Sequence, residues 1–480
     1  MGAAVALPTR LLPTGSLLAA SAAEQVNLGI VGCGWRGGDL RKIFEKLPGV
    51  KIAGLCDVDR ELVDKLGQES PQAKRWTDLR QMFDSPDIDA VAIATCNHWH
   101  CLAAIWAMQA GKHVYVEKPL GHTQWEGEQV INASANYQRI CQVGTQQRSD
   151  PMQAEIKHFL HEDKAIGDLE SVRVNRFGVR ESIGRRAQPL VPPSSVDYNL
   201  WLGPAQEMPI FRDKLHYDWH WDWNTGSGEM GNWGVHVLDD VRNNVFLDSI
   251  AAPNSITAAG GRFAWNDAGN TPNVHFAVLD AGGIPVVVTL SNLPIDQLPS
   301  ITARPKSGYI AYCSEGRLEG QRGKAAAFDV DGKLIKKFKG DGGNGHHQQN
   351  FIDAVRDNKP ELLVAPAQVG HDTTTWCNLI NIASRVPHSS GEAADSILAP
   401  AIGTESAATI FEQIGTIVTA NAAANAVEQL QLGPTLHYDT GHGDTGHGDT
   451  AHGRFVGRQS DYANRLLRRN YRTPFDVPEV

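Results

Sequence analysis

Short apolar runs alternate with segments of helical spacing along the N-terminal part of the chain. Leu40, Ile43, Phe44 and Leu47 lie three or four positions apart after the first run, and a second helical stretch ends at Gly111. The apolar runs predict buried strands over 26–31, 51–56, 90–95, 113–116 and 140–144. Strands that alternate with helices in this way predict a parallel, doubly wound Rossmann sheet, whose ligands bind beyond the carboxyl ends of the strands.

The pattern changes from residue 150 onward, where strand-like segments follow one another without a helix between each pair. These segments are 169–177, 255–259, 274–279, 285–290 and 309–313, and helical spacing returns over 347–356 and 368–385. Successive strands of this kind indicate an antiparallel sheet. The fold class is therefore predicted as α/β, with an N-terminal Rossmann domain over 25–149 and a second α/β domain over 150–385, built on an open, mostly antiparallel sheet.

Composition and charge narrow the class of protein. The chain has 480 residues, with 44 Lys and Arg against 54 Asp and Glu, so its formal net charge is −10. This balance offers no basic surface for a nucleic-acid backbone, and no nucleic-acid partner is expected. No apolar run reaches the roughly 18 to 20 residues needed to cross a bilayer. The seven scattered cysteines show neither C-x-x-C nor zinc-ribbon spacing, so no metal site and no disulfide framework is expected.

Residues 1–24 differ in composition from the rest of the chain. Positions 2–22 are rich in Ala and Leu, lack acidic residues and end in the small residues Ala20, Ser21 and Ala22. An apolar stretch with small residues at its end is typical of an export signal, although Arg10 is the one basic residue in it. We expect a protein that is exported already folded, to the periplasm or beyond; the alternative is a cytoplasmic protein with a low-complexity leader.

A G-x-G-x-x-G motif follows the first predicted strand. Gly32 permits the tight turn, Gly34 lets backbone amides approach a pyrophosphate, and Gly37 permits close packing of the following helix. Asp57 ends the second strand, 20 residues after Gly37, where a carboxylate hydrogen-bonds ribose hydroxyls and repels a 2′-phosphate. The motif therefore predicts NAD as cofactor, with NADP less favoured. Trp35 and Arg36 of this turn are also expected beside the cofactor. Arg36 is a cation that could bind a phosphate instead.

Polar side chains follow the next two strands at the same predicted edge of the sheet. They occur in Thr95-Cys96-Asn97-His98-Trp99-His100 and in Glu117-Lys118. Together with the glycine turn, the stretch GKHVYVEKPL over 111–120 and a later Gly-x-His-x-x-Asp, this chain resembles the Gfo/Idh/MocA oxidoreductase family from about residue 26 to about 385. Cys96 stands where the family usually has Pro. The resemblance implies a Rossmann domain joined to a second α/β domain, and hydride exchange between NAD(P) and a hydroxyl of a sugar, polyol or related compound.

The resemblance also assigns residues to the site. Cofactor contacts are expected from Gly32, Gly34, Trp35, Arg36, Gly37, Asp57, Thr95, Asn97, His100, Glu117 and Lys118. Lys118 is further expected to stabilise developing charge on the substrate oxygen. His236 matches the position of the family's general acid or base. Histidine suits that role because it changes charge near neutral pH. The family usually has Asp four residues before it, whereas this chain has Asn232, which can only orient the ring or the substrate. Helical spacing predicts that Asn232, His236 and Asp239 share one face.

The stretch from His216 to Trp223 alternates between polar and aromatic residues. If it is extended, its His and Asp side chains lie on one face and its aromatic rings on the other. One interpretation is a substrate wall formed by His216, Asp218, His220, Asp222 and Trp223. An amphipathic strand that packs its Trp residues into the core is an equal alternative, and a metal site is less favoured because such ligands converge poorly.

Residues 386–480 exceed the core implied by the resemblance. They contain the repeat DTGHG-DTGHG-DTAHG over 439–453, whose Gly-rich, polar composition predicts a flexible loop in which His442, His447 and His452 bind metal adventitiously at most. The flanking segments 430–437 and 462–474 carry Leu, Tyr, Phe and Pro, and we expect them to pack back on the body. A homo-oligomer is expected, with this region near the subunit interface.

Three functions remain open from the sequence. The first is an NAD-dependent dehydrogenase of a carbohydrate. The second is a redox-neutral enzyme that oxidises a sugar hydroxyl transiently and reduces it again on one bound NAD, as some glycosidases of this scaffold do. The third is a dinucleotide-dependent sugar-binding protein without activity, which would tolerate loss of both Lys118 and His236. An exported enzyme favours the second, because free NAD is scarce outside the cytoplasm.

Overall fold

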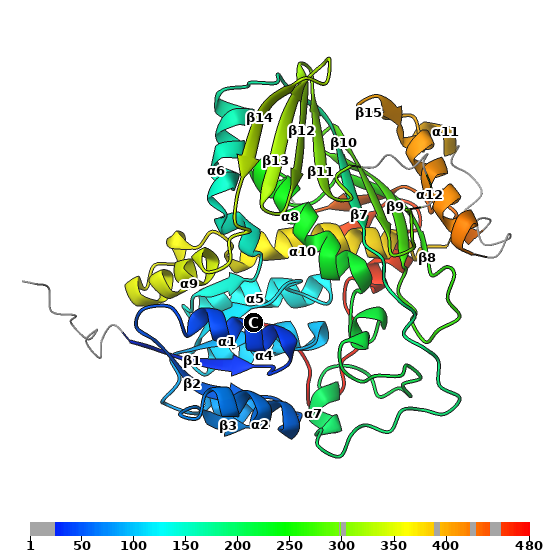
Figure 1. The fold of residues 1–480 in the computed structure, drawn as a ribbon. Coiled ribbons are helices and arrows are strands. Elements are labelled where there is room, and N and C mark those ends of the chain that lie inside the picture. The colour runs from blue at the N-terminus through cyan, green and yellow to red at the C-terminus, as the bar shows by residue number, and fades with distance from the viewer. Residues whose placement is uncertain (1–24, 297, 299–303, 388–393, 423–428, 442–452) are drawn as a thin grey trace, which may run out of the picture.

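The computed structural model describes residues 25–296, 298, 304–387, 394–422, 429–441 and 453–480. The leader 1–24 and most of the predicted repeat loop, 442–452, lie outside these ranges. Within the described residues the N-terminal domain has a parallel sheet of order β3-β2-β1-β4-β5-β6 (Figure 1). Its strands are β1 (Val26–Val31), β2 (Val50–Cys56), β3 (Lys74–Trp76), β4 (Ala90–Ile93), β5 (His113–Val116) and β6 (Cys141–Val143).

Helices cover both faces of this sheet, which is why its central strands β1 and β4 are largely apolar rather than alternating. One face packs against α3 (Leu79–Phe83), α4 (Asn97–Gln109) and α5 (Gln124–Asn136). The other face packs against α1 (Trp35–Phe44), α2 (Arg60–Glu69) and α9 (His346–Asp357). α9 comes from the second half of the sequence, and its Phe351 contacts Phe44 and Tyr115 edge to face. The predicted Rossmann fold is confirmed.

The second domain has a mostly antiparallel sheet of order β14-β13-β12-β11-β7-β10-β9-β8-β17-β18 among the described residues. Five of its strands were predicted: β7 (Leu169–Phe177), β8 (Ser255–Gly261), β9 (Val274–Ala281), β10 (Ile284–Ser291) and β11 (Ser307–Cys313). Sequence patterning missed β12 (Gly316–Gln321), β13 (Lys324–Asp329), β14 (Leu334–Lys339), β17 (Leu436–Asp439) and β18 (Arg454–Val456). β7 and β10 are parallel neighbours, and the other pairs are antiparallel.

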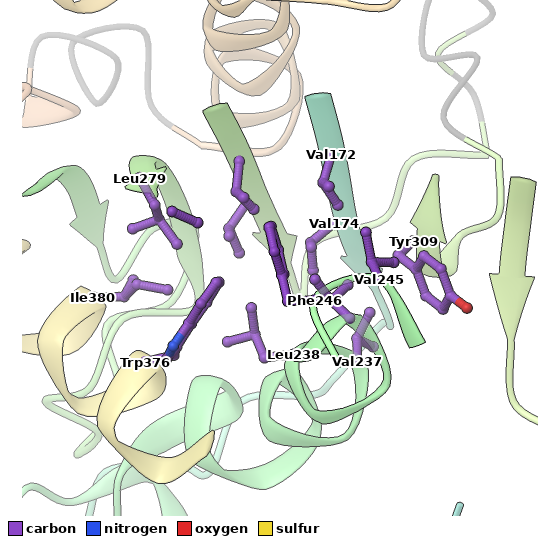
Figure 2. Packing of buried hydrophobic residues seen from close by; sticks show 14 of the residues in the cluster. Val172, Val174, Val237, Leu238, Val245, Phe246, Leu279, Tyr309, Trp376 and Ile380 are labelled. Carbon is purple, nitrogen blue, oxygen red and sulfur yellow. The ribbon is translucent and has the colours of Figure 1, made fainter. Parts of the chain in front are cut away.

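The core of this domain lies between the sheet and two helices, α8 (Val235–Asn244) and α10 (Ala367–Ala383). Figure 2 shows Val172 and Val174 of β7 above Leu238 of α8, with Trp376 of α10 alongside. All four side chains are buried, and burying an aliphatic or aromatic side chain contributes roughly 1.5 to 3 kcal/mol. The opposite face is covered by α12 (Ala407–Asn421), next to the short pair β15 (Ala401–Ile402) and β16 (Glu405–Ser406), with α11 (Ala394–Ile397) preceding them.

The C-terminal residues pack back on both domains. β17 extends the large sheet beside β8, and β18 pairs with β17, followed by α13 (Ser460–Arg465). The chain then crosses to the Rossmann domain, where Phe475 lies edge to face against Trp99 of α4. These contacts place the described parts of 430–437 and 462–474 on the body, as the sequence predicts.

Two further helices lie between the Rossmann sheet and α8 along the chain. α6 (Pro151–Lys157) continues as a π-helical turn, His158–Glu162, and leads into β7. Between β7 and α8 runs a long segment with the short helix α7 (Tyr198–Leu202), which carries a small apolar cluster of its own around Trp201. No helix among the described residues is long and apolar enough to cross a bilayer. All seven cysteines are free thiols, and all but Cys96 are buried.

Candidate active site

The three glycines of the turn after β1 have distinct surroundings. Gly32 has φ +90°, and a Cβ there would lie 2.6 Å from the carbonyl oxygen of Ala94. A Cβ on Gly37 would lie 1.7 Å from the Gly32 carbonyl oxygen, so α1 approaches the strand too closely for any side chain. A Cβ on Gly34 would meet nothing within 4 Å. Gly34 therefore leaves open space at the N-terminus of α1, where backbone N–H groups attract a phosphate, and the turn fits a dinucleotide.

Asp57 follows β2 and faces this turn. Its Oδ2 accepts a hydrogen bond from the Cys33 amide at 2.6 Å, and its Oδ1 accepts one from the Asp59 amide at 2.9 Å. Burial raises the pKa of the Asp57 carboxyl, while these two amide donors oppose the rise. The amides fix the carboxylate at the carboxyl end of β2, which is the position from which an acidic residue hydrogen-bonds the adenosine ribose in Rossmann folds.

Arg36 points away from Asp57. Its Nε lies 2.6 Å from Oε1 of Glu117, a buried residue that directly follows β5. In the sheet, β1 and β4 stand between β2 and β5, a separation of roughly 14 Å at ordinary strand spacing. The guanidinium is therefore held at the other side of the glycine turn and is not directed at the ribose end marked by Asp57.

The polar residues after β4 are held by hydrogen bonds to neighbouring segments and do not project from a loop. Asn97 is the first residue of α4, so His98 and His100 lie in its first turn. The ring nitrogens of His98 lie 3.2 and 3.1 Å from the carbonyl oxygens of Thr225 and Trp201, and burial lowers the pKa of His98 to about 3. The ring nitrogens of His100 lie 2.8 Å from the carbonyl oxygen of Pro119 and 3.1 Å from that of Thr95, and burial lowers its pKa also.

Lys118 reaches across the domain boundary. Its Nζ donates to the backbone carbonyl of Asn232 at 2.6 Å and lies 3.4 Å from that residue's Oδ1. Burial lowers the pKa of Lys118 to about 8, partly opposed by the neighbouring carboxylate of Glu117. A lysine that titrates near neutral pH suits a group that donates a hydrogen bond to a reacting oxygen.

Behind Asn232 lies a carboxylate that sequence reasoning missed. Glu229 is fully buried and forms ion pairs with Arg176 at 2.7 Å and Arg180 at 3.2 Å. Its Oε2 also accepts a hydrogen bond from Nδ2 of Asn232 at 3.3 Å. The chain thus has an acidic residue close to Asn232, displaced by three positions from where the family resemblance expects one. The only signal for it in the sequence is an acid within a Gly-rich stretch before His236.

His236 lies in the first turn of α8, just after the π-helical turn Met230–Gly234. Its ring is buried and stands edge to face against Trp233, with 5.7 Å between the ring centroids. Among the described residues Nδ1 has no hydrogen-bond partner. Burial and the nearby cations Lys118, Arg322, Arg36 and Arg176 hold the pKa of His236 well below its usual range. The imidazole is therefore neutral at pH 7, so a ring nitrogen can accept a proton, and the lowered pKa makes it a weaker base than a free histidine.

Asp239 does not join this group. Its carboxylate pairs with Arg148 at 2.9 Å and accepts a hydrogen bond from Thr373 at 2.8 Å. Both Asp239 and Arg148 are buried, and Arg148 also pairs with Asp248. This network ties the end of the Rossmann domain to α8 and α10, so Asp239 has a structural role.

The predicted extended stretch from His216 to Trp223 is wrong. Tyr217 has φ +65°, and Asp218–Trp221 form a 3-10 turn, so the polar side chains do not share a face. His216 pairs with Asp59 at 2.9 Å, beside the cofactor turn. Asp222 pairs with Arg212, and the Trp223 ring lies under the guanidinium of Arg385.

Of the residues predicted to form the substrate wall, His220 is the one whose pKa is affected by the charge of Lys118. Its ring stacks on Trp219 with 3.6 Å between the centroids, and Nδ1 lies 2.6 Å from the carbonyl oxygen of Tyr217. Burial, together with Lys118 and Arg180, lowers the pKa of His220 to about 3. Asp218 is buried, and burial raises the pKa of its carboxyl. Among the described residues, no cluster of three or more His, Cys, Asp or Glu side chains is placed to hold a metal ion.

Comparison with known families agrees with both domains. A model of an oxidoreductase family with an NAD-binding Rossmann fold matches residues 26–145, and the model of that family's C-terminal α/β domain matches residues 182–280; both models belong to Gfo/Idh/MocA.

Curated relatives match over part of their length. An inositol 2-dehydrogenase 2 of Saccharopolyspora erythraea is 30% identical over 175 residues, which are 36% of this chain and 49% of the relative. An alpha-N-acetylgalactosaminidase of Shewanella oneidensis is 35% identical over 129 residues, 25% of this chain and 28% of the relative. The match thus spans less than half of the length of either relative.

Solved structures share the fold over most of their length. The WlbA dehydrogenase of Bordetella pertussis, in complex with NADH and UDP-GlcNAcA, has a TM-score of 0.56 at 17% identity, over 75% of this chain and 97% of that one. GenD2 from gentamicin A biosynthesis, in complex with NAD, has a TM-score of 0.55 at 17% identity, over 78% of this chain and 97% of that one.

Proposed function

Because the chain belongs to the Gfo/Idh/MocA oxidoreductase family, we propose that it oxidises or reduces a hydroxyl of a sugar, polyol or related carbohydrate by hydride transfer with NAD. The observation that carries this proposal is the Lys118–Asn232 contact at the domain boundary, 2.6 Å long, with a neutral, buried His236 one helical turn further on. A cation and a proton acceptor beside one another are the two groups that oxidation of an alcohol needs.

Each side chain has a separate task in the proposed reaction. When bound, NAD supplies the hydride acceptor. Lys118 donates a hydrogen bond to the substrate oxygen and stabilises negative charge that develops there, an effect strengthened by low water content. His236 accepts the hydroxyl proton through a ring nitrogen. In the reverse direction His236 returns that proton to the oxygen. Glu229 acts through Asn232, because its hydrogen bond holds the amide that lies beside Lys118.

The cofactor preference proposed is NAD over NADP. It is supported by Asp57 at the end of β2, held in place by the Cys33 amide. The pairing of Arg36 with Glu117 supports it further, since the one cation of the glycine turn is directed elsewhere.

The test of the activity uses purified full-length protein and a panel of inositols, hexoses, amino sugars and uronic acids. Reduced nicotinamide is followed by its near-ultraviolet absorbance while NAD is present in excess. We expect stoichiometric NADH with at least one member of the panel. Lys118→Met should abolish this signal and keep NAD binding, which separates an enzyme from a dinucleotide-dependent sugar-binding protein.

A second proposed function is redox-neutral catalysis, in which NAD remains bound and is recycled. The glycosidase named among the relatives supports it, at partial coverage. The same residues serve both schemes, because the first step of each is oxidation of a hydroxyl. A panel of aryl N-acetylhexosaminides distinguishes them: aglycone release without net NADH favours recycling, and NADH without aglycone release favours the dehydrogenase.

We also propose export of the folded protein, on the composition of residues 2–22. A cofactor domain that is loaded with NAD before export agrees with a reaction that recycles the cofactor. N-terminal sequencing of the protein from its native source tests this. A chain that starts near residue 23 outside the cytoplasm supports export, and an intact Met1 in the cytoplasm refutes it.

A further inference from the structure

A cavity of about 560 Å³ lies where four parts of the chain meet: the segment after β5, the segment between β7 and α8, the end of α10 and the C-terminal extension. None of the residues placed in the reaction above lines it, since Lys118, Asn232 and His236 are absent from its wall. The wall does include Trp223, which the sequence had suggested for substrate. The cavity is therefore distinct from the proposed reaction site.

The wall is strongly basic. Four arginines line it, namely Arg385, Arg465, Arg468 and Arg469. Arg465 and Arg468 are exposed and Arg385 and Arg469 are partly exposed. None of the four has a carboxylate within 4.0 Å among the described residues. The carboxylate with the strongest electrostatic effect on Arg469 is that of Glu126. Burial raises the pKa of Glu126 to about 7. The cavity thus carries an excess of positive charge that the described protein residues do not neutralise.

Two of these arginines are held in place by stacking on tryptophan. The Arg385 guanidinium lies 4.7 Å from the ring centroid of Trp223, and that of Arg468 lies 4.0 Å from the ring centroid of Trp125. A third, Arg469, is fixed by His122 at 3.0 Å and by the carbonyl of Pro204 at 3.3 Å. Stacked and tethered guanidinium groups lose little freedom when they bind an anion, and their planar fork matches a carboxylate or phosphate.

The same wall offers hydrogen-bonding groups for hydroxyls. Asn378 lines the cavity, is 6% exposed, and its Nδ2 has no hydrogen-bond partner among the described residues. A buried amide donor without a partner costs free energy unless a ligand or water satisfies it. Gln206 and Asn224 also line the cavity, and the Asn224 side chain accepts a hydrogen bond from the Gln206 amide and donates one to the Gln206 carbonyl. Amides beside arginines are the combination that recognises a hydroxylated anion.

We propose that this cavity is a second ligand site, which binds a small hydroxylated anion such as a sugar phosphate or a sugar acid. The shared chemistry is one phosphate or carboxylate group, bound by Arg385, Arg468 and Arg469, on a polyol that hydrogen-bonds Asn378. This site does not depend on the proposed hydride transfer, because its residues take no part in it. The site gives the C-terminal extension a function, since Arg468 and Arg469 belong to that extension.

Isothermal titration calorimetry on the full-length protein tests the proposal, with inorganic phosphate, glucose 6-phosphate, glucuronate and glucose as separate ligands. NAD is kept saturating throughout, so that phosphate cannot occupy the glycine turn. We expect glucose 6-phosphate to bind about tenfold more tightly than inorganic phosphate, and glucose to show no binding that depends on the cavity arginines. The arms with phosphate and carboxylate show which anion the arginines prefer.

The double variant Arg385→Gln/Arg468→Gln should weaken the binding of glucose 6-phosphate at least about tenfold. Arg458→Gln is the matched control, because Arg458 is an exposed arginine of the same extension that does not line the cavity, and it should change nothing. Equal binding of glucose 6-phosphate to wild type and double variant, or no binding of any anion, would overturn the proposal. Hexoses and uronic acids are also candidate substrates, so only binding that the double variant weakens is assigned to this cavity, and binding that it leaves unchanged is assigned to the proposed reaction site.

Discussion

The ammonium group of Lys118 donates a hydrogen bond of 2.6 Å to the backbone carbonyl of Asn232, and so joins the segment after β5 in one domain to the π-helical turn before α8 in the other. The two residues are 114 positions apart in the sequence. The contact places a cation of the cofactor domain beside the buried imidazole of His236 in the second domain. Any relative motion of the domains therefore changes the spacing of the two groups proposed to act on the substrate.

Lys118 should produce an alkaline limit on the rate. Its pKa is lowered to about 8 by burial, so it is charged at pH 7 and loses its proton as pH rises through about 8. Because the charged form is the one that stabilises the substrate oxygen, kcat/KM for hydroxyl oxidation should fall across that range. Lys118→Met should lower turnover at least about a hundredfold and keep NAD binding.

The matched variant for this profile is Lys118→Arg, whose guanidinium stays charged at all accessible pH values. It should lack the alkaline limit even if its maximal rate is lower. A pH–rate profile of the Arg variant with the same fall near pH 8 would show that another group titrates.

His236→Ala should also lose at least about a hundredfold in turnover while NAD affinity is kept. Asn232→Asp is the finer test. A carboxylate at that position favours the charged imidazole and the charged lysine, so both limits of the pH–rate profile should move to higher pH. The pH–rate profiles of wild type and variant measure this. If His236→Ala retains most of its turnover across pH, the proton acceptor is another group, and His220 is the next to examine.

Asp57 should decide between the two dinucleotides. Its carboxylate repels a 2′-phosphate, so we expect NADP to bind at least about tenfold more weakly than NAD. Asp57→Asn should weaken NAD and narrow this difference, because the repulsion is removed. Dissociation constants from nucleotide fluorescence or calorimetry measure both effects. Asp64→Asn, an exposed residue of α2 paired with Arg75, serves as the control and should leave both constants unchanged.

Glu229→Gln should destabilise the fold as well as the site. The carboxylate is fully buried and neutralises Arg176 and Arg180, so its loss leaves two guanidinium groups without their acid. Breaking a buried ion pair from one side costs about 3 kcal/mol in the free energy of unfolding. The same change at Glu45, which is 43% exposed and paired with Arg41, should cost less than about 1 kcal/mol. Urea unfolding of both variants makes the comparison, and equal losses would contradict the assigned role of Glu229.

Local pattern was sufficient for the architecture. Apolar runs such as 26–31 form β1 because both faces of a parallel sheet are covered, and the glycine turn has its shape because Gly32 and Gly37 have no room for a Cβ. These are properties of short segments and their immediate neighbours. The same holds for β7, whose Val172 and Val174 alternate with polar residues along the strand. Strands with weaker patterns, such as β14 with its four exposed residues in succession, gave no signal.

The site depended on contacts that no local pattern encodes. Lys118, Asn232 and His236 were proposed from motifs, but the hydrogen bond between the first two exists because two domains pack in one relative orientation. Glu229 was missed because its importance comes from Arg176 and Arg180, some fifty positions earlier in the chain. The alternation from His216 to Trp223 misled for the same reason. A strand would expose its polar face together, but His216 binds Asp59 and Asp222 binds Arg212, and these tertiary partners, with the positive φ of Tyr217, turn the backbone out of the extended form.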